Sequence, residues 1–125
     1  MNLNQITIPS KNVNKAIDFY SLLGLKLIVH THDKYARFEC PNGESTFSIH
    51  YVEEFDTTGI AIYFEVPKLT EKVKELQSKG VVFETEIIHQ SWLWTEARLK
   101  DPDNNTLIIY HAGKNRKYPP WRKED

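Results

Sequence analysis

The sequence predicts an α+β fold made of two tandem βαβββ modules, which form a single domain over residues 1–112. Three observations predict it. Short segments in which polar and apolar residues alternate recur along the chain, as in half-buried strands. Two stretches carry apolar residues at three- and four-residue steps, as helices do, and each ends at a glycine. The order of elements in residues 1–54 is repeated in residues 57–112, which indicates an internal repeat.

The first module begins with an alternating strand over residues 3–8, which Pro9 and Ser10 are expected to end. Asn12 is a suitable N-cap for the helix that follows. Gly24 ends this helix, because a residue without a Cβ adopts positive φ at little cost. The remaining strands of the module are expected at residues 25–30, 34–40 and 45–52.

The second module repeats this order from residue 59. Gly59–Val66 is a strand, and Thr70 caps a helix that Gly80 ends. A shift of 56 positions superimposes the modules and places Gln5 on Ala61, so they match in pattern rather than in identity. The remaining strands are expected at residues 81–83, within residues 87–100, and at residues 107–110.

The composition predicts a cytoplasmic protein that binds neither nucleic acid nor a membrane. Sixteen basic residues oppose seventeen acidic ones, which gives no general attraction for polyanions. No apolar run approaches the roughly 20 residues that cross a bilayer. The first residues lack the features of a signal peptide. The single cysteine, Cys40, cannot form an internal disulfide.

Residues 113–125 form a separate basic and aromatic tail. They show no periodicity, and four of the ten residues in Gly113–Arg122 are basic. Because Tyr118 and Trp121 are unfavourable in water, we expect the tail to dock on this subunit or on a partner. A solvated tail and a nucleic-acid-binding arm are the alternatives.

Three segments carry a resemblance to a known family. The segments are Gln5–Ile8 with Asn12–Val13 and Phe19–Leu25, then Ile62–Pro67 leading to Leu76–Val81, and finally Asp101–Ile108. In this order and spacing they resemble the vicinal oxygen chelate superfamily, which includes glyoxalase I, extradiol dioxygenases and the bleomycin and fosfomycin resistance proteins. The resemblance implies that the modules form a cupped mixed sheet with helices on its outer face. It does not imply a reaction, because one fold hosts many chemistries.

Enzymes of this family hold a divalent metal in the cup with His, Glu or Gln side chains from four strands. The resemblance places these positions at Gln5, Ser48, Ala61 and Ile108. Since alanine and isoleucine cannot ligate a metal, we expect no metal cofactor. The alternative is a divalent metal held by displaced ligands around Gln5 and His50.

Strand alternation predicts which side chains line the cup. If the apolar positions of each strand pack under the helices, the residues of opposite parity face the cup. That face combines aromatic rings with a few polar groups and suits a small organic ligand. Arg37 or Arg98 would hold a carboxylate or phosphate. The candidate ligand-binding residues are Gln5, Arg37, Ser48, His50, Tyr63, Trp94, Arg98 and Tyr110.

We therefore expect a protein of the drug-resistance type that binds a small organic molecule without the family metal. The alternative is a metal-dependent lyase or dioxygenase, with His50 and Glu65 as candidate catalytic residues. A structural or regulatory module that acts through its tail is a third hypothesis. Relatives of this length often pair, and exposed edge strands favour pairing, so we expect a homodimer.

Overall fold

The computed structural model describes residues 1–124, which form eight strands and three helices. Asp125, the last residue of the predicted tail, lies outside the described residues. The chain divides into two compact units. Unit 1 comprises Met1–Thr58 and Asp101–Asn104, and unit 2 comprises Gly59–Lys100 and the residues from Asn105 onward.

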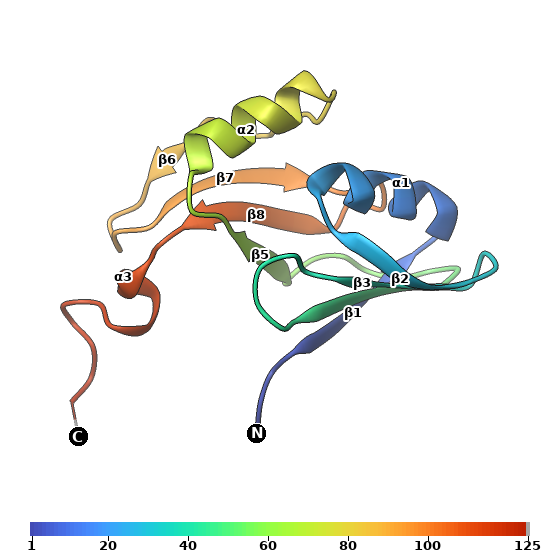
Figure 1. Ribbon diagram of the computed structural model, residues 1–125, viewed down its shortest axis with the longest axis horizontal. Coiled ribbons are helices and arrows are strands. Elements are labelled where there is room, and N and C mark those ends of the chain that lie inside the picture. Colours follow the sequence, from blue (N-terminus) through green and yellow to red (C-terminus); the bar gives the residue numbers. More distant parts are fainter. Residues whose placement is uncertain (125) are drawn as a thin grey trace. The chain divides into compact units, whose positions relative to one another are not determined.

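Unit 1 is a four-stranded mixed sheet with one helix on one of its faces (Figure 1). Its strand order is β1-β4-β3-β2, in which β1 runs parallel to β4 and the other pairs are antiparallel. The Asn12 side chain accepts a hydrogen bond from the Lys15 N–H, and Gly24 has φ of 105°, which confirms both predicted caps. The elements are β1 (Gln5–Ser10), α1 (Val13–Leu23), β2 (Lys26–Thr31), β3 (Tyr35–Glu39) and β4 (Thr46–Tyr51).

Aromatic side chains form the core between α1 and its sheet. The Tyr20 ring centroid lies 4.7 Å from that of Phe47 and 6.1 Å from that of Phe38. All three rings are buried, as the helical spacing of α1 predicts for Tyr20 and the parity of the strands predicts for Phe38 and Phe47. The Tyr20 hydroxyl donates to Asp101 Oδ2 at 2.6 Å, which attaches the Asp101–Asn104 turn to unit 1.

Unit 2 repeats the architecture of unit 1. Its strand order is β5-β8-β7-β6, with β5 parallel to β8, and α2 packs on β7 and β8 (Figure 1). The starts of β5 and α2 follow those of β1 and α1 by the predicted 56 positions. The predicted α+β fold of two βαβββ modules is therefore confirmed. The elements are β5 (Ala61–Glu65), α2 (Leu69–Ser78), β6 (Ile88–His89), β7 (Thr95–Lys100), β8 (Thr106–His111) and α3 (Lys114–Lys117).

The first strand does not end at Pro9, contrary to the prediction. Strand β1 continues through Pro9 and Ser10, and Pro9 is the register partner of His50 on β4. Because β1 is the outer strand of its sheet, a residue without an N–H is tolerated there. The outer position also leaves Ile6 exposed, since α1 packs on β2, β3 and β4.

The predicted strand at residues 81–83 is also wrong. Only Phe83 forms an isolated bridge, to Leu99, and the second strand of unit 2 is β6. The reason is local, because the Val81 N–H donates to the Leu76 carbonyl and completes the end of α2. Helix α2 begins after Lys68 without a side-chain cap, so Thr70 is not the N-cap.

The tail contains the short helix α3, which the sequence did not predict. Tyr118 and Trp121 are 58% and 57% exposed, so these two rings do not dock the tail on this chain. The contacts are made instead by the backbone of residues 112–115 and by Arg116, as described below. No helix within residues 1–124 has the length and apolar character needed to cross a bilayer.

Candidate functional site

The face of the unit 1 sheet opposite α1 carries a chain of hydrogen-bonded side chains, which we call the polar row. Gln5 Nε2 donates to Ser48 Oγ at 2.5 Å, and Ser48 Oγ is hydrogen-bonded to the Tyr35 hydroxyl at 2.7 Å. Arg37 Nε donates to the Tyr35 hydroxyl at 2.9 Å. The polar row brings three predicted ligand-binding residues together, because Arg37 and Ser48 are register partners on β3 and β4.

Burial is uneven along the polar row. Ser48, on the inner strand β4, is fully buried, whereas Gln5 on the outer strand is exposed. Gln5 also accepts a hydrogen bond from the Thr46 hydroxyl. The Gln5 amide is therefore held on both its nitrogen and its oxygen. A ligand above this face would meet Gln5 and the half-buried Arg37 before Ser48.

His50 takes no part in the hydrogen bonds of the polar row. It is the register partner of Tyr35 on β3, and it is exposed. Its predicted catalytic partner, Glu65, belongs to unit 2. A catalytic function for either residue stays a prediction.

In unit 2 the face opposite α2 carries three packed rings, which we call the aromatic surface. Trp94 stacks on Tyr110 with a centroid separation of 4.9 Å and an interplanar angle of 23°. Tyr63 meets both rings edge-on, at 5.8 Å from Trp94 and 5.4 Å from Tyr110. Such edge-to-face and stacked pairs are favourable arrangements of aromatic side chains. Three predicted ligand-binding residues thus form one contiguous surface.

The three rings differ in exposure. Tyr110 is buried on the inner strand β8, Trp94 is half-buried, and Tyr63 on the outer strand β5 is 45% exposed. Burial, followed by the nearby Glu65 carboxylate, raises the pKa of Tyr110. The Tyr110 phenol is therefore neutral at physiological pH and able to donate a hydrogen bond.

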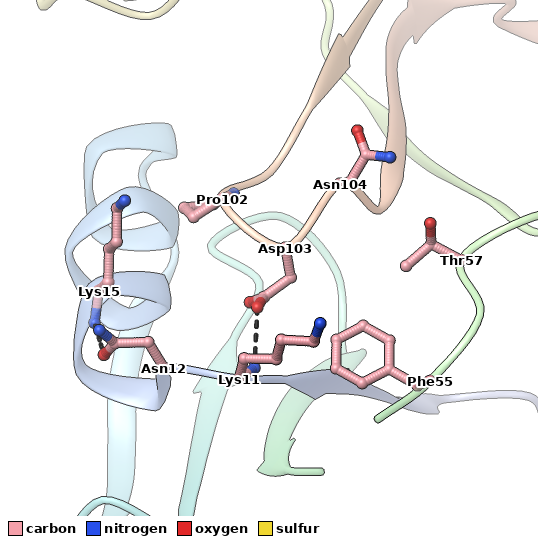
Figure 2. Close-up of a pocket in the computed structure, with 8 residues that line it drawn as sticks. All are labelled: Lys11, Asn12, Lys15, Phe55, Thr57, Pro102, Asp103 and Asn104. Carbon is pink, nitrogen blue, oxygen red and sulfur yellow. Dashed lines mark hydrogen bonds between the residues drawn. The ribbon is translucent and has the colours of Figure 1, made fainter. Parts of the chain in front are cut away.

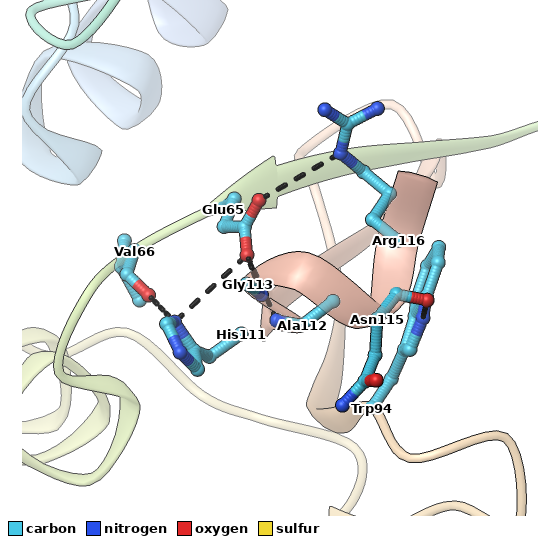
Figure 3. A network of polar contacts seen from close by, with 8 residues as sticks. All are labelled: Glu65, Val66, Trp94, His111, Ala112, Gly113, Asn115 and Arg116. Atoms are coloured by element: carbon cyan, nitrogen blue, oxygen red, sulfur yellow. Dashed lines mark hydrogen bonds and ion pairs between the residues drawn. The ribbon is translucent and has the colours of Figure 1, made fainter. Parts of the chain in front are cut away.

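Glu65 holds the segment that leads into α3 (Figure 3). Its Oε2 accepts hydrogen bonds from the N–H groups of Ala112 at 2.8 Å and Gly113 at 2.9 Å. Burial alone would raise the pKa of Glu65, but these two N–H groups, with His111 and Arg116, outweigh it and lower the pKa. The Trp94 indole N–H donates to the Asn115 carbonyl at 3.2 Å, which ties the same segment to the aromatic surface.

The structure adds Glu96 to the residues beside the aromatic surface. Glu96 is the register partner of Tyr110, and it is only 8% exposed. Its Oε1 accepts a hydrogen bond from the Gln90 amide at 2.9 Å, while its buried Oε2 has no partner among the described residues. Glu96 was not among the candidates, although alternation along β7 places it on one face with Trp94 and Arg98. That shared parity is the signal that would have found it.

Arg98 stands one row further along the same face. It is the register partner of Ile108, and its side chain is exposed. No ion pair of the described residues joins it to Glu96 or Glu65. Arg98 therefore lies open to solvent in the row beyond Glu96.

The four positions carried over from the family do not fit a divalent metal. Ala61 and Ile108 offer no donor atom, and the Gln5 amide is held by Ser48 and Thr46. Within residues 1–124 no three His, Cys, Asp or Glu side chains are grouped closely enough to bind a metal ion.

A separate pocket of about 460 Å³ lies at the start of α1 (Figure 2). Asp103 Oδ1 accepts a hydrogen bond from the Lys11 N–H at 2.8 Å, and the Lys11 ammonium lies 5.7 Å from the centre of the Phe55 ring. None of the predicted site residues lines it. The Lys11–Asp103 hydrogen bond attaches the Asp101–Asn104 turn to the rest of unit 1.

Comparisons with known proteins agree with this architecture. No curated protein is significantly similar to the chain in sequence. A bleomycin resistance determinant encoded on the transposon Tn5 has a TM-score of 0.74 at 18% identity, covering 89% of this chain and 98% of its own. A bleomycin-binding protein complexed with bleomycin has a TM-score of 0.71 at 19% identity, with the same coverages. Lactoylglutathione lyase from Agrobacterium tumefaciens has a TM-score of 0.71 at 12% identity, covering 88% and 92%.

These three likenesses concern the fold alone. The sequence itself matches the family model of the Glyoxalase/Bleomycin resistance protein/Dioxygenase superfamily over residues 2–109, which is most of the chain. The matched residues include the polar row, Tyr63 and Trp94 of the aromatic surface, and all of both modules except the end of β8. The chain therefore belongs to the Glyoxalase/Bleomycin resistance protein/Dioxygenase superfamily.

Proposed function

We propose that this protein binds a small organic molecule at the aromatic surface of unit 2, without the metal of the family's enzymes. The observation that carries the proposal is the packing of Tyr63, Trp94 and Tyr110 on the face opposite α2, with Tyr63 open to solvent. Aromatic side chains beside a few polar groups are typical of the lining of sites for small organic ligands. The fold shared with a bleomycin-binding protein supports the same class of function.

Trp94 is the residue that tests this proposal, because its half-buried ring is stacked on Tyr110 and meets Tyr63. The neutral fluorescent probe N-phenyl-1-naphthylamine should bind wild-type protein saturably. Trp94→Ala should weaken that binding on the order of tenfold, because a stacking partner and its apolar area are lost. Fluorescence titration measures both affinities.

Trp92→Ala is the matched control. Trp92 is exposed and lies outside the aromatic surface, so the same substitution two residues away should leave the affinity unchanged. Circular dichroism should show that both variants fold. Equal affinities for wild-type protein and Trp94→Ala would contradict the proposal.

The absence of a bound metal is a separate part of the proposal. Its support is the donor set, since two of the four family positions are apolar. Elemental analysis of protein purified without chelator should find no stoichiometric transition metal. A stoichiometric metal that is lost in His50→Ala would instead favour the metal-dependent lyase or dioxygenase.

We also propose a homodimer. Each sheet ends in two outer strands, β1 and β2 in unit 1 and β5 and β6 in unit 2, and such edges favour pairing with another strand. Analytical ultracentrifugation should give twice the 14.7 kDa mass of the chain. A single 14.7 kDa species at micromolar concentration would contradict a dimer.

A cytoplasmic location is proposed on the chemistry of the single cysteine. Burial raises the pKa of the Cys40 thiol, and as the single cysteine of the sequence it cannot form an internal disulfide. Such a thiol suits a reducing compartment, where disulfides are rare.

A further inference from the structure

Glu96 is a buried acid without a full set of partners. Its side chain lies on β7, on the face that carries the aromatic surface, and the Gln90 amide donates a hydrogen bond to Oε1. Oε2 is buried and has no partner among the described residues. A buried polar atom that lacks a hydrogen bond is unfavourable, and more so when it is charged. A hydrogen-bond donor of a ligand that reached this oxygen would therefore be stabilised there.

The other charged groups on this face do not neutralise Glu96. Glu65, on the far side of Tyr110, is the acid that the tail engages, through Ala112, Gly113 and Arg116. Arg98 is exposed in the next row and makes no ion pair with Glu96 among the described contacts. The carboxylate next to the rings is thus left without a counter-charge.

Aromatic rings and an acid together favour one class of ligand. Faces of Trp and Tyr rings attract cations, and a buried carboxylate prefers a charged N–H donor to a neutral one. Tyr110 is the register partner of Glu96, and Trp94 lies two residues before Glu96, so both residues neighbour Glu96 on the same face of the sheet.

We infer that the ligand of the aromatic surface is an organic cation with an N–H donor, an amidinium or a primary ammonium, whose charge is held by Glu96. This inference rests on the proposed function, because it names the chemical class of the molecule bound there. Glu96 is then the specificity-determining residue of the surface, and the rings bind the apolar part of the ligand.

Three probes of one shape test the inference. Benzamidine is a cation, benzamide is neutral and benzoate is an anion, and all three present the same ring. Calorimetric titration or displacement of N-phenyl-1-naphthylamine should show benzamidine binding wild-type protein at least about tenfold more tightly than benzamide. Benzoate should bind most weakly. Equal affinities, or tighter binding of benzamide or benzoate, would overturn the inference.

Two variants assign the preference to Glu96. Glu96→Gln should bring benzamidine and benzamide to equal affinity, whereas Glu86→Gln removes the same charge from an exposed position and should keep the preference. If Glu96→Gln still bound benzamidine more tightly than benzamide, the assignment of the preference to Glu96 would be wrong. If Glu96→Gln fails to fold, Glu96→Asp, which keeps the charge, should retain the preference for benzamidine.

The test separates this inference from the proposed function. If N-phenyl-1-naphthylamine binds through Trp94 but no preference for benzamidine is found, the aromatic surface binds organic molecules and the inference is wrong. If neither the naphthyl probe nor any of the three benzene derivatives binds, the proposed function fails and the inference fails with it.

Discussion

At the scale of single residues, unit 1 contains a buried hydrogen-bonded pair, Tyr20 and Asp101. Tyr20 is fully buried, and its hydroxyl donates to Asp101 Oδ2 at 2.6 Å. Burial, and then the Asp101 carboxylate, raises the pKa of Tyr20 far above its usual range, so the hydroxyl remains a donor at any physiological pH. Asp101 also accepts a hydrogen bond from the Asp103 N–H, which shapes the turn around Pro102.

Tyr20→Phe should lower the free energy of unfolding by about 1–3 kcal/mol, because the Asp101 carboxylate loses a buried donor. Urea denaturation followed by circular dichroism measures the change. Tyr51→Phe is the control, since Tyr51 is exposed and its ring would keep its contact with the Lys34 ammonium. Equal destabilisation by the two substitutions would show that the buried hydrogen bond contributes no more to the free energy of unfolding than the exposed Tyr51 hydroxyl does.

At the scale of elements, α3 depends on a carboxylate at the end of β5. The helix is only four residues long, and isolated helices of that length are not stable in water. Its position follows from the Glu65 contacts with the Ala112 and Gly113 N–H groups and from the Trp94 contact with Asn115. Gly113 has φ of 57°, which favours glycine at the bend before α3.

The contact of the Glu65 carboxylate with the Ala112 and Gly113 N–H groups should depend on pH. Because the folded-state pKa of Glu65 lies below its ordinary value of 4.5, the stabilisation is fully present above that value and is lost as the pH falls through the lower folded-state pKa. The Gly113 amide signal in a proton–nitrogen NMR spectrum should titrate with a midpoint below 4.5. Glu65→Gln should abolish this titration.

Glu71→Gln provides the comparison for that measurement. Glu71 is an exposed acid in the first turn of α2, and its loss should leave the Gly113 titration in place. If the Gly113 amide titrated identically in Glu65→Gln, the carboxylate would not be the group that holds the segment before α3.

The ends of the helices in the two units show which boundaries local sequence signals can predict. The Asn12 cap and the Gly24 end of α1 could be predicted, because capping is decided within a few residues. Helix α2 begins at Leu69 after Lys68, whose side chain makes no capping hydrogen bond, and residues 81–83 are not a strand. In that region, the packing of Leu69 and the backbone contact of Val81 with the end of α2 decided the boundaries.

At the scale of the whole molecule, the two units repeat one topology with different surface chemistry. In both sheets the first strand of the unit lies at one edge and pairs in parallel with the last strand of the four-stranded module, β1 with β4 and β5 with β8. The face opposite the helix is a polar row in unit 1 and an aromatic surface in unit 2. The repeat therefore supplies the scaffold twice, while the side chains on each face differ.

The parity of the strands could be predicted, and with it much of the candidate site. Alternation placed Gln5 and Ser48 on one face, and Tyr63 and Tyr110 on one face, and the structure brings each pair together. Alternation could not predict how deeply each side chain is buried. Ser48, Ile108 and Tyr110 are buried because they lie on the inner strands β4 and β8.

The sequence by itself determined the fold, the family and the face on which each strand residue lies, because periodicity and capping are local properties of the chain. Only the tertiary structure decided which acidic side chains have hydrogen-bond partners for their oxygens. Glu65 is engaged by backbone groups 47 and 48 residues away, whereas Glu96 keeps an unpaired buried oxygen. Both facts depend on neighbours supplied by distant segments, and no local pattern encodes them.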